Sequence, residues 1–390
     1  MLVLYGLGTT VGAGIYALIG EIAGVAGNNA VWAFLLASLL AGFTACSFAE
    51  LSARYPRTAG AALYAQSGFA SARVGQIIGV LVALAGIVSS AALMNGFVGY
   101  LHEFIAVERE IMIAGCVAVL TGIAVWGVTQ SVIVAGVISV IEVGGLIWIV
   151  LLGADHVSLD SVAWPGLELG AWAPIAWGGV LAFYAFIGFE DLVEVVEEVK
   201  GSRRTLPLAI LLTLFISAAI YVMLVVTAIA ALGPVGLSES SAPLASLYSH
   251  LTNKDPLLIS LIGVVAIVNG ALIQIIMASR VLYGLASRKQ LPAALALVSS
   301  ATQTPIIATV VAGILVLLLA LAGNVAGLAQ ITSTVMLAVF AIVNLALWRI
   351  KKQIPTVPGV MIFPRWLSLL GFFVCSAFVV LSLSDWAVVG

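Results

Sequence analysis

The chain has 390 residues, of which 63% are hydrophobic and only 8% charged, and its formal net charge is −2. Soluble domains carry about 25% charged residues, so the composition excludes an ordinary soluble protein, and the charge balance gives no basis for binding nucleic acid. Apolar runs of roughly 17 to 25 residues, the length that crosses a hydrocarbon core, recur along the whole chain. We therefore expect an all-α polytopic membrane protein, with residues 1–390 forming a single transmembrane domain.

Eleven membrane spans are predicted in this chain. Their centres lie near residues 11, 41, 84, 119, 141, 186, 219, 269, 313, 337 and 375. The first span follows no basic segment and no small-residue cleavage site, so we expect it to remain in the mature protein. The cysteines Cys46, Cys116 and Cys375 are far apart and lack CxxC spacing, which indicates neither a metal site nor a disulfide framework. We expect no metal and no cofactor.

The first span contains "YGLGTTVGAGIYALIG", residues 5–20, with five glycines. A phosphate-binding loop would need a preceding strand and the spacing of a nucleotide fingerprint, and the positions of Gly6, Gly8, Gly12 and Gly14 fit neither requirement. Each glycine weakens a helix by about 1 kcal/mol relative to alanine. The pattern therefore predicts a helix interrupted in mid-span, while the alternative is close helix packing through small residues.

The fifth span, residues 132–152, places Glu142 near its centre. An acid there costs about 2.5 to 3.5 kcal/mol on insertion scales, so an intramembrane carboxylate indicates a functional site. Burial disfavours the charged form of a carboxyl group, so Glu142 is a candidate to take up and release a coupling proton. The alternative is a permanently protonated side chain that is hydrogen-bonded to a neighbouring helix.

The sixth span contains a second interruption, in "GGVLAFYAFIGFEDLVEVVEEVKG", residues 178–201, where Gly188 precedes Glu190 and Asp191. These two acids are candidates for coupling or for a gate pair with Arg280. The inner end of this span carries Glu194, Glu197 and Glu198, followed by Lys200, Arg203 and Arg204. This pattern is typical of a solvated helix end, with ion pairs that latch an inner gate.

Interruptions in corresponding spans of two halves point to an inverted-repeat transporter, with the substrate bound where half-helix ends converge. Unpaired N–H groups at one break suit a carboxylate, and unpaired carbonyls at the other suit an ammonium group. An α-amino acid carries both charges about one residue apart.

Lys and Arg residues are distributed unevenly between the two sides of the predicted membrane. Because cytoplasmic loops retain positive charge, a cytoplasmic N-terminus leaves only Arg109 and Lys254 outside. The residues on or near the cytoplasmic side are Arg54, Arg57, Arg73, Lys200, Arg203, Arg204, Arg280, Arg288, Lys289, Arg349, Lys351, Lys352 and Arg365. This asymmetry supports both the orientation and the number of spans.

Four stretches, "GTTVGAGIY", "ARYPRTAGAALYA", "FYAFIGFEDLVEVVEEVKGSRRTLPLAI" and "SRVLYGLASRKQLPAALALVSSATQTP", resemble the amino acid/polyamine/organocation (APC) transporter family in order and spacing. The resemblance implies a LeuT-like fold with discontinuous helices 1 and 6 and alternating access. It implies two inverted repeats of five helices, residues 1–152 and 174–348, followed by an extra helix over residues 366–383.

The resemblance also implies roles for the residues at the two breaks. The backbone amides of Gly12, Ala13 and Gly14, beside Thr10, would hold the substrate carboxylate. The carbonyls of Tyr184, Ala185 and Ile187 would receive its ammonium group, and Phe189 would act as an aromatic gate. Near Glu142, proton-coupled relatives carry a lysine, close to the region where sodium-coupled relatives bind an ion.

We therefore predict a secondary active amino acid transporter in the plasma (inner) membrane, with protons as coupling ions and the lipid bilayer as its setting. The alternatives are an exchanger of an amino acid for an amine or another amino acid, and a sensor that binds without transport. An enzyme is not expected, because no histidine falls within a predicted span and no nucleophile and base are clustered. The sequence gives no indication of the oligomeric state.

Overall fold

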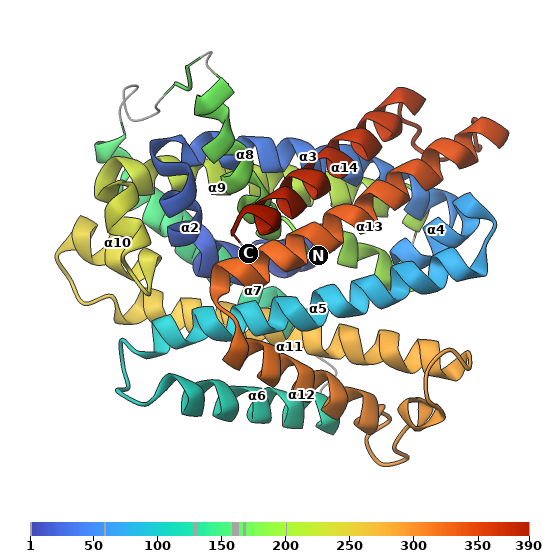
Figure 1. Cartoon of the computed structure of the whole chain (residues 1–390), viewed down its shortest axis with the longest axis horizontal. Helices are drawn as coiled ribbons and strands as arrows, with labels where there is room; N and C mark the ends of the chain where they lie inside the picture. The colour runs from blue at the N-terminus through green and yellow to red at the C-terminus, as the bar shows by residue number, and fades with distance from the viewer. Residues whose placement is uncertain are drawn as a thin grey trace.

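The structure is a computed structural model that describes residues 2–57, 60–127, 132–157, 164–166, 169–199 and 201–389. The regular elements in these ranges are all helical, which confirms the predicted all-α class (Figure 1). The α-helices are α1 (Leu2–Thr10), α2 (Ala13–Ala26), α3 (Ala30–Arg54), α4 (Gly60–Phe69), α5 (Ala72–Leu101), α6 (Arg109–Trp126), α7 (Val132–Leu152), α8 (Leu169–Tyr184), α9 (Ser202–Ser238), α10 (Pro243–Thr252), α11 (Leu257–Ser287), α12 (Ile306–Ala322), α13 (Val325–Gln353) and α14 (Arg365–Val389). The 3-10 helices are η1 (Gly27–Asn29), η2 (Ala154–His156), η4 (Phe189–Glu198) and η5 (Ala293–Ala296).

Helical segments surround all eleven predicted span centres, and the centres at residues 11 and 186 fall in interruptions between helices. By length and composition, seven segments in the described part of the chain are suited to crossing a membrane. They are Leu2–Arg54, Ala72–Leu101, Arg109–Trp126, Arg203–Ser238, Leu257–Ser287, Val325–Gln353 and Arg365–Ser384. The first of these, 53 residues long, contains the broken helix and α3, and the shorter apolar helices Gly136–Leu152 and Ile306–Ala322 lie outside the seven. The protein is a polytopic membrane protein.

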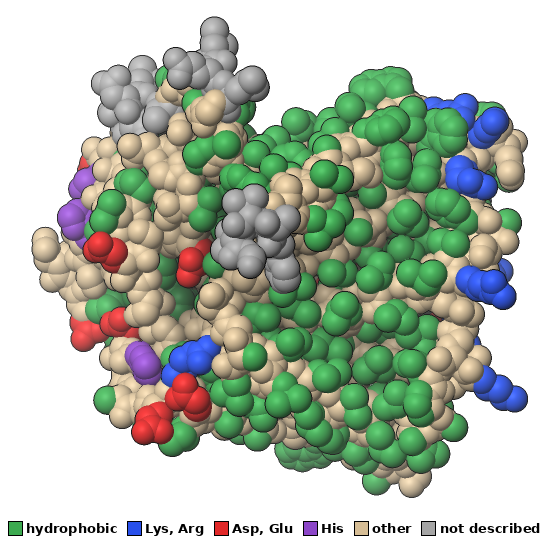
Figure 2. All heavy atoms as spheres, viewed as in Figure 1, with side chains coloured by type: hydrophobic (Ala, Val, Ile, Leu, Met, Phe, Trp, Pro, Cys, Tyr) green, Lys and Arg blue, Asp and Glu red, His purple; other side chains and the backbone are tan. Residues whose placement is uncertain are grey.

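The molecular surface divides into an apolar middle and two charged ends (Figure 2). Large hydrophobic side chains such as Phe215, Val140 and Val380 are exposed on the middle of the helices, as a surface in contact with lipid requires. Most of the Lys and Arg side chains in this view gather at one end, and the acidic and histidine side chains gather at the other. We call the first the basic end; α3 and α13 terminate there and α14 begins there. Lys200 lies outside the described residues.

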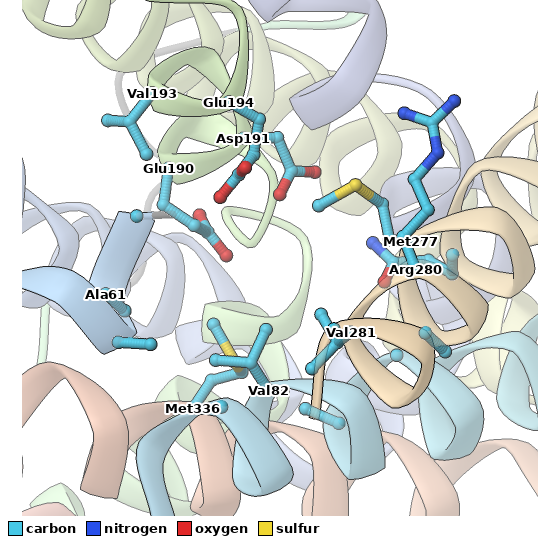
Figure 3. A pocket seen from close by; sticks show the side chains of 18 of the residues that line it. Ala61, Val82, Glu190, Asp191, Val193, Glu194, Met277, Arg280, Val281 and Met336 are labelled. Carbon is cyan, nitrogen blue, oxygen red and sulfur yellow. The ribbon is translucent and has the colours of Figure 1, made fainter. Parts of the chain in front are cut away.

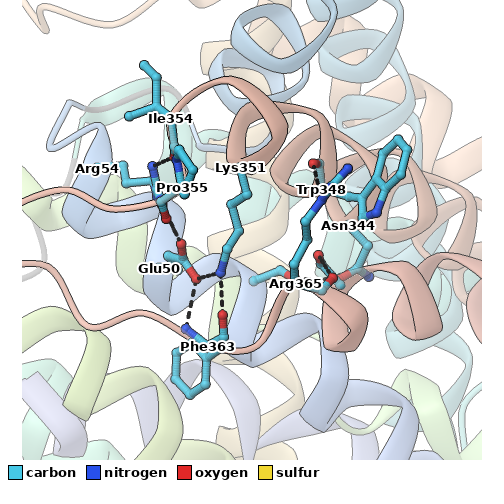
Figure 4. Close-up of polar contacts among 11 residues, drawn as sticks. Glu50, Arg54, Asn344, Trp348, Lys351, Ile354, Pro355, Phe363 and Arg365 are labelled. Carbon is cyan, nitrogen blue, oxygen red and sulfur yellow. Dashed lines mark hydrogen bonds and ion pairs between the residues drawn. The ribbon is translucent and has the colours of Figure 1, made fainter.

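A buried polar network holds α3, α13 and the segment before α14 together at the basic end (Figure 4). Glu50 is fully buried and accepts hydrogen bonds from Arg54 at 2.8 Å, from Lys351 at 2.7 Å and from the backbone N–H of Phe363 at 3.0 Å. Arg54 also donates to the carbonyl of Ile354 at 2.9 Å. Because each oxygen of the buried carboxylate has charged partners, the network satisfies a group that would otherwise be costly to bury.

Two spans are broken, and these breaks organise the site. Helix α1 ends at Thr10 and α2 begins at Ala13, and α8 ends at Tyr184 before η4 begins at Phe189. At the second break Gly188 has φ +125°, a backbone conformation that residues other than glycine rarely adopt. The discontinuous helices predicted from the glycine patterns are therefore present. Short α4 and α10 were not predicted, because neither is long enough to produce the apolar run of a span.

Candidate functional site

The two breaks are in direct contact. A Cβ atom placed on Gly14 would lie 2.8 Å from the Cα of Ala185, and one placed on Gly188 would overlap the carbonyl oxygen of Thr9. Only residues without side chains allow the two backbones to approach this closely. The structure therefore brings together the groups that sequence analysis assigned to the substrate carboxylate and to its ammonium.

Tyr221 of α9 lies between the two breaks and connects them. Its hydroxyl oxygen is 2.7 Å from the carbonyl oxygen of Thr10 and 2.8 Å from that of Ala185, so its single proton can be donated to either carbonyl. The tyrosine ring is fully buried against Phe34 and Phe186, with ring centroids 5.9 and 5.1 Å away. A side chain held in this way fixes the separation of the two breaks.

A second contact between the two breaks is made by Thr9, the residue before Thr10. Its hydroxyl lies 3.0 Å from the carbonyl of Gly188 and 3.0 Å from that of Gly6, one turn back in α1. Side-chain hydroxyls thus contact backbone carbonyls at both breaks, those of Thr10, Ala185 and Gly188.

A small cavity of about 30 Å³ lies at the breaks. Its lining residues come from five helices and the second break: Gly8, Thr9, Thr10, Ala13, Gly14, Ser89, Leu93, Tyr184, Ile187, Gly270, Ile273 and Gln274. Three of them, Ser89, Ile187 and Gln274, also line a larger cavity of about 360 Å³ (Figure 3). The larger volume is within the usual range of sites for small molecules, about 300 to 1,000 Å³. The breaks therefore adjoin a space large enough for an amino acid.

The backbone around the small cavity offers groups of both polarities. The N-cap of α2 is Gly12, which provides no side-chain cap, so the first N–H groups of this helix, on Ala13 and Gly14, suit an anion. On the other side, the carbonyl of Tyr184 accepts from the N–H of Ile187 at 3.1 Å and that of Ala185 faces Tyr221. A carbonyl oxygen has a second lone pair, so both remain able to accept from an ammonium.

Glu142 of α7 is fully buried beside the first break. A Cβ atom on Gly12 would lie 2.8 Å from Oε2 of Glu142, and this oxygen has no hydrogen-bond partner among the described residues. The other carboxylate oxygen is 3.5 Å from the amide nitrogen of Asn269 on α11, longer than a normal hydrogen bond. The carboxyl group thus has one unsatisfied oxygen directed at the backbone of the break.

The remaining predicted residues separate into two groups. Phe189 is fully buried, with its ring centroid 6.0 Å from that of Phe48 and 5.6 Å from that of Phe340. Glu190, Asp191 and Arg280 line the larger cavity, the two acids from η4 and the arginine from α11 (Figure 3). None of the ion pairs found in the described part of the chain joins Arg280 to either acid.

Sequence reasoning did not identify Tyr221, Ser89 or Gly270 as parts of this site. The Ser89 hydroxyl is 2.8 Å from that of Tyr184, and Gly270 lets α11 approach Ala13, since a Cβ there would lie 2.6 Å from the Cβ of Ala13. Single tyrosines, serines and glycines are common in membrane helices, so no sequence pattern distinguished these three.

Comparison with known proteins places the chain in a family. A family model described as "Amino acid permease" matches residues 2–385. The chain belongs to the amino acid permease family. This membership confirms the resemblance to APC transporters that the four sequence stretches indicated.

Several relatives of this amino acid permease can be aligned over most of its length. "Cationic amino acid transporter 3, mitochondrial" of Arabidopsis thaliana is 30% identical over 380 residues, covering 91% of this chain and 62% of the relative. "Cationic amino acid transporter 4" of Homo sapiens is 27% identical over 387 residues, covering 91% and 60%. An uncharacterized transporter of Mycobacterium tuberculosis is 30% identical over 351 residues, covering 88% and 77%. The permease thus spans less than two thirds of the plant and human relatives.

Proposed function

We propose that this permease is a secondary active amino acid transporter that works by alternating access. The observation that carries the proposal is the contact between the two breaks, where the N-terminus of α2 and the carbonyls after α8 face one small cavity. These groups match the carboxylate and the ammonium of an α-amino acid, because helix N-termini attract anions and unpaired carbonyls attract cations. The names of the plant and human relatives, which refer to amino acid transport, support the same substrate class.

The architecture that accompanies this proposal is the LeuT-like one. Residues 1–152 and 174–348 form the two inverted repeats, and residues 366–383 form an additional helix. Support comes from the breaks themselves, which interrupt the first helix of each proposed repeat. The basic end faces the cytoplasm, since cytoplasmic ends of membrane proteins are enriched in Lys and Arg, and the proposed membrane is the plasma membrane.

Protons are the proposed coupling ions, with Glu142 as the group that binds them. Its buried Oε2, which has no hydrogen-bond partner in the described part of the chain, lies against the break at Gly12. The protonation state of this oxygen would therefore directly affect the backbone that binds the carboxylate. A neutral carboxyl is favoured while the site is dry, and an ionised one while water reaches it. Alternation between the two conditions would load and release one proton in each cycle.

The side chain of the substrate points, in this proposal, into the larger cavity. That cavity contains the carboxylates Glu190, Asp191 and Glu194, and the plant and human relatives are named for cationic amino acids. Lysine and arginine therefore belong in any test beside neutral amino acids such as alanine and leucine.

The test is uptake of this labelled panel into proteoliposomes that contain the purified protein. Accumulation driven by an inward proton gradient supports symport. Uptake that ignores the gradient but requires amino acid or amine inside the vesicle identifies an exchanger. Binding without uptake in either format identifies a sensor, and neither binding nor uptake of any panel member refutes the proposed function.

A further inference from the structure

The larger cavity lies between α4 and η4 on one side and α11 on the other. On one side, Gly60, Ala61 and Ala62 of α4 line it beside Val193 and Glu194 of η4, and on the other side lie residues of α11 including Arg280 (Figure 3). Helix α4 packs against α13 through Arg349, which donates a hydrogen bond to the carbonyl of Gly68 at 3.0 Å. The Cζ atom of Arg349 also lies 4.7 Å from the centroid of the Phe69 ring.

The η4 segment has the features of a moving part. It is a ten-residue 3-10 helix, longer than most, and 3-10 segments have poorer hydrogen-bond geometry than α-helices and often mark hinges. It follows Gly188, whose positive φ of 125° is readily adopted only by glycine. Among the elements that line this cavity, η4 is therefore the one with a glycine hinge and a 3-10 backbone.

Glu194 of η4 lies against α4 in this structure. A Cβ atom on Gly60 would be 2.6 Å from Oε1 of Glu194 and 3.1 Å from a methyl carbon of Val193. One turn along α4, Tyr64 is fully buried and its hydroxyl has no hydrogen-bond partner among the described residues. Burial raises the pKa of Tyr64 above its ordinary value, and the negative charge of Glu194 adds to the effect. The contact with α4 is thus close but leaves a polar group unsatisfied, which is a cost.

Across the cavity, Arg280 has an exposed side chain and takes part in none of the ion pairs found among the described residues. Burial raises the pKa of Glu194, and the positive charge of Arg280 acts against this and lowers it. An ion pair between them would cross the cavity, which both residues line.

We propose that Glu194 is the moving half of an inner gate: it rests on α4 while the cavity is open, and it pairs with Arg280 of α11 when η4 swings across to close the cavity. In this gate Arg280 pairs with Glu194, whereas the sequence analysis paired Arg280 with Glu190 and Asp191. Its role in transport rests on the proposed function, whereas the closure itself does not.

The test measures closure without any substrate. Val82 of α5 lines the cavity, so the rate at which a water-soluble maleimide labels the cysteine introduced by Val82→Cys reports how often the cavity is open. The chain with only its native Cys46, Cys116 and Cys375 sets the background. A symmetric elution profile in size-exclusion chromatography confirms that each variant is folded.

We expect Glu194→Gln and Arg280→Gln each to raise the labelling rate roughly two- to fivefold, the range for a partly exposed ion pair. The double variant should show no further rise, since both changes remove the same pair, and the charge exchange Glu194→Arg with Arg280→Glu should restore the slower rate. The matched control is Arg288→Gln, which alters another arginine that lines the cavity and should leave the rate unchanged.

Unchanged labelling in either single variant, additive effects in the double variant, or an equal rise in Arg288→Gln would overturn the gate. Because labelling needs no substrate, its outcome is independent of the uptake assay. Absence of amino acid uptake together with the expected labelling pattern would refute the proposed function and leave the gate standing.

Discussion

The Tyr221 hydroxyl is the side-chain group whose removal should disturb the two breaks most selectively. Tyr221→Phe keeps the buried ring and removes the hydroxyl that contacts the carbonyls of both Thr10 and Ala185, at 2.7 and 2.8 Å. A buried acceptor that loses its donor costs about 1 to 3 kcal/mol, and about 1.4 kcal/mol corresponds to a tenfold change in an equilibrium constant. If this cost lowers the free energy of substrate binding in full, the affinity for the amino acid should fall roughly 5- to 100-fold.

The assay is competitive binding of a labelled amino acid to purified protein, with Tyr100→Phe as the matched control. Tyr100 is also fully buried and donates to a carbonyl, that of Tyr16 within α2, at 3.1 Å, so the control removes a comparable hydroxyl away from the breaks. We expect Tyr221→Phe to weaken binding and Tyr100→Phe to change it much less. Unaltered affinity in Tyr221→Phe, or equal loss in both variants, would refute the argument that this hydroxyl sets the geometry of the site.

Two further predictions concern close contacts and stability. Gly14→Ala should sharply lower binding and uptake, because its Cβ would be 2.8 Å from the backbone of Ala185 and overpacking costs about 1 to 3 kcal/mol. The control is Gly42→Ala, where nothing lies within 4 Å of the added atom, and it should leave both unchanged. Equal effects of the two substitutions would contradict the account. Glu50→Gln should markedly lower the melting temperature in detergent, since removing one partner of a buried charge network costs about 3 to 5 kcal/mol. Lys352→Gln, at an exposed site, should leave the melting temperature unchanged. A wild-type melting temperature for Glu50→Gln would show that the network contributes little to stability.

The main features of the fold were readable from composition and glycine spacing. The apolar runs predicted where the helices lie, and the glycines near residues 8–14 and at 188 predicted the two interruptions. Glycine is informative here because the backbone must approach another backbone at both places. The burial of Glu142 also followed from its position at the centre of an apolar span.

Other parts of the site depend on tertiary contacts that leave no periodic trace in the sequence. Tyr221 connects the two breaks only because α9 lies beside both α1 and η4. The contact between Glu194 and Gly60 joins residues more than a hundred positions apart, and α4, which supplies Gly60, is too short to be recognised by an apolar run. Such contacts are set by how helices pack, and helix packing has several solutions for the same apolar pattern.

The most direct test of proton-coupled transport compares gradient-driven uptake by the wild type with uptake by Glu142→Gln. One charge crossing 100 mV is worth about 2.3 kcal/mol, which sustains a concentration ratio of roughly fortyfold. The control is Glu21→Gln, a change at a second acid within a membrane-spanning helix, but at an exposed position on α2. The account predicts accumulation in the wild type and in Glu21→Gln, and in Glu142→Gln only equilibration. Accumulation to the wild-type ratio by Glu142→Gln would contradict it.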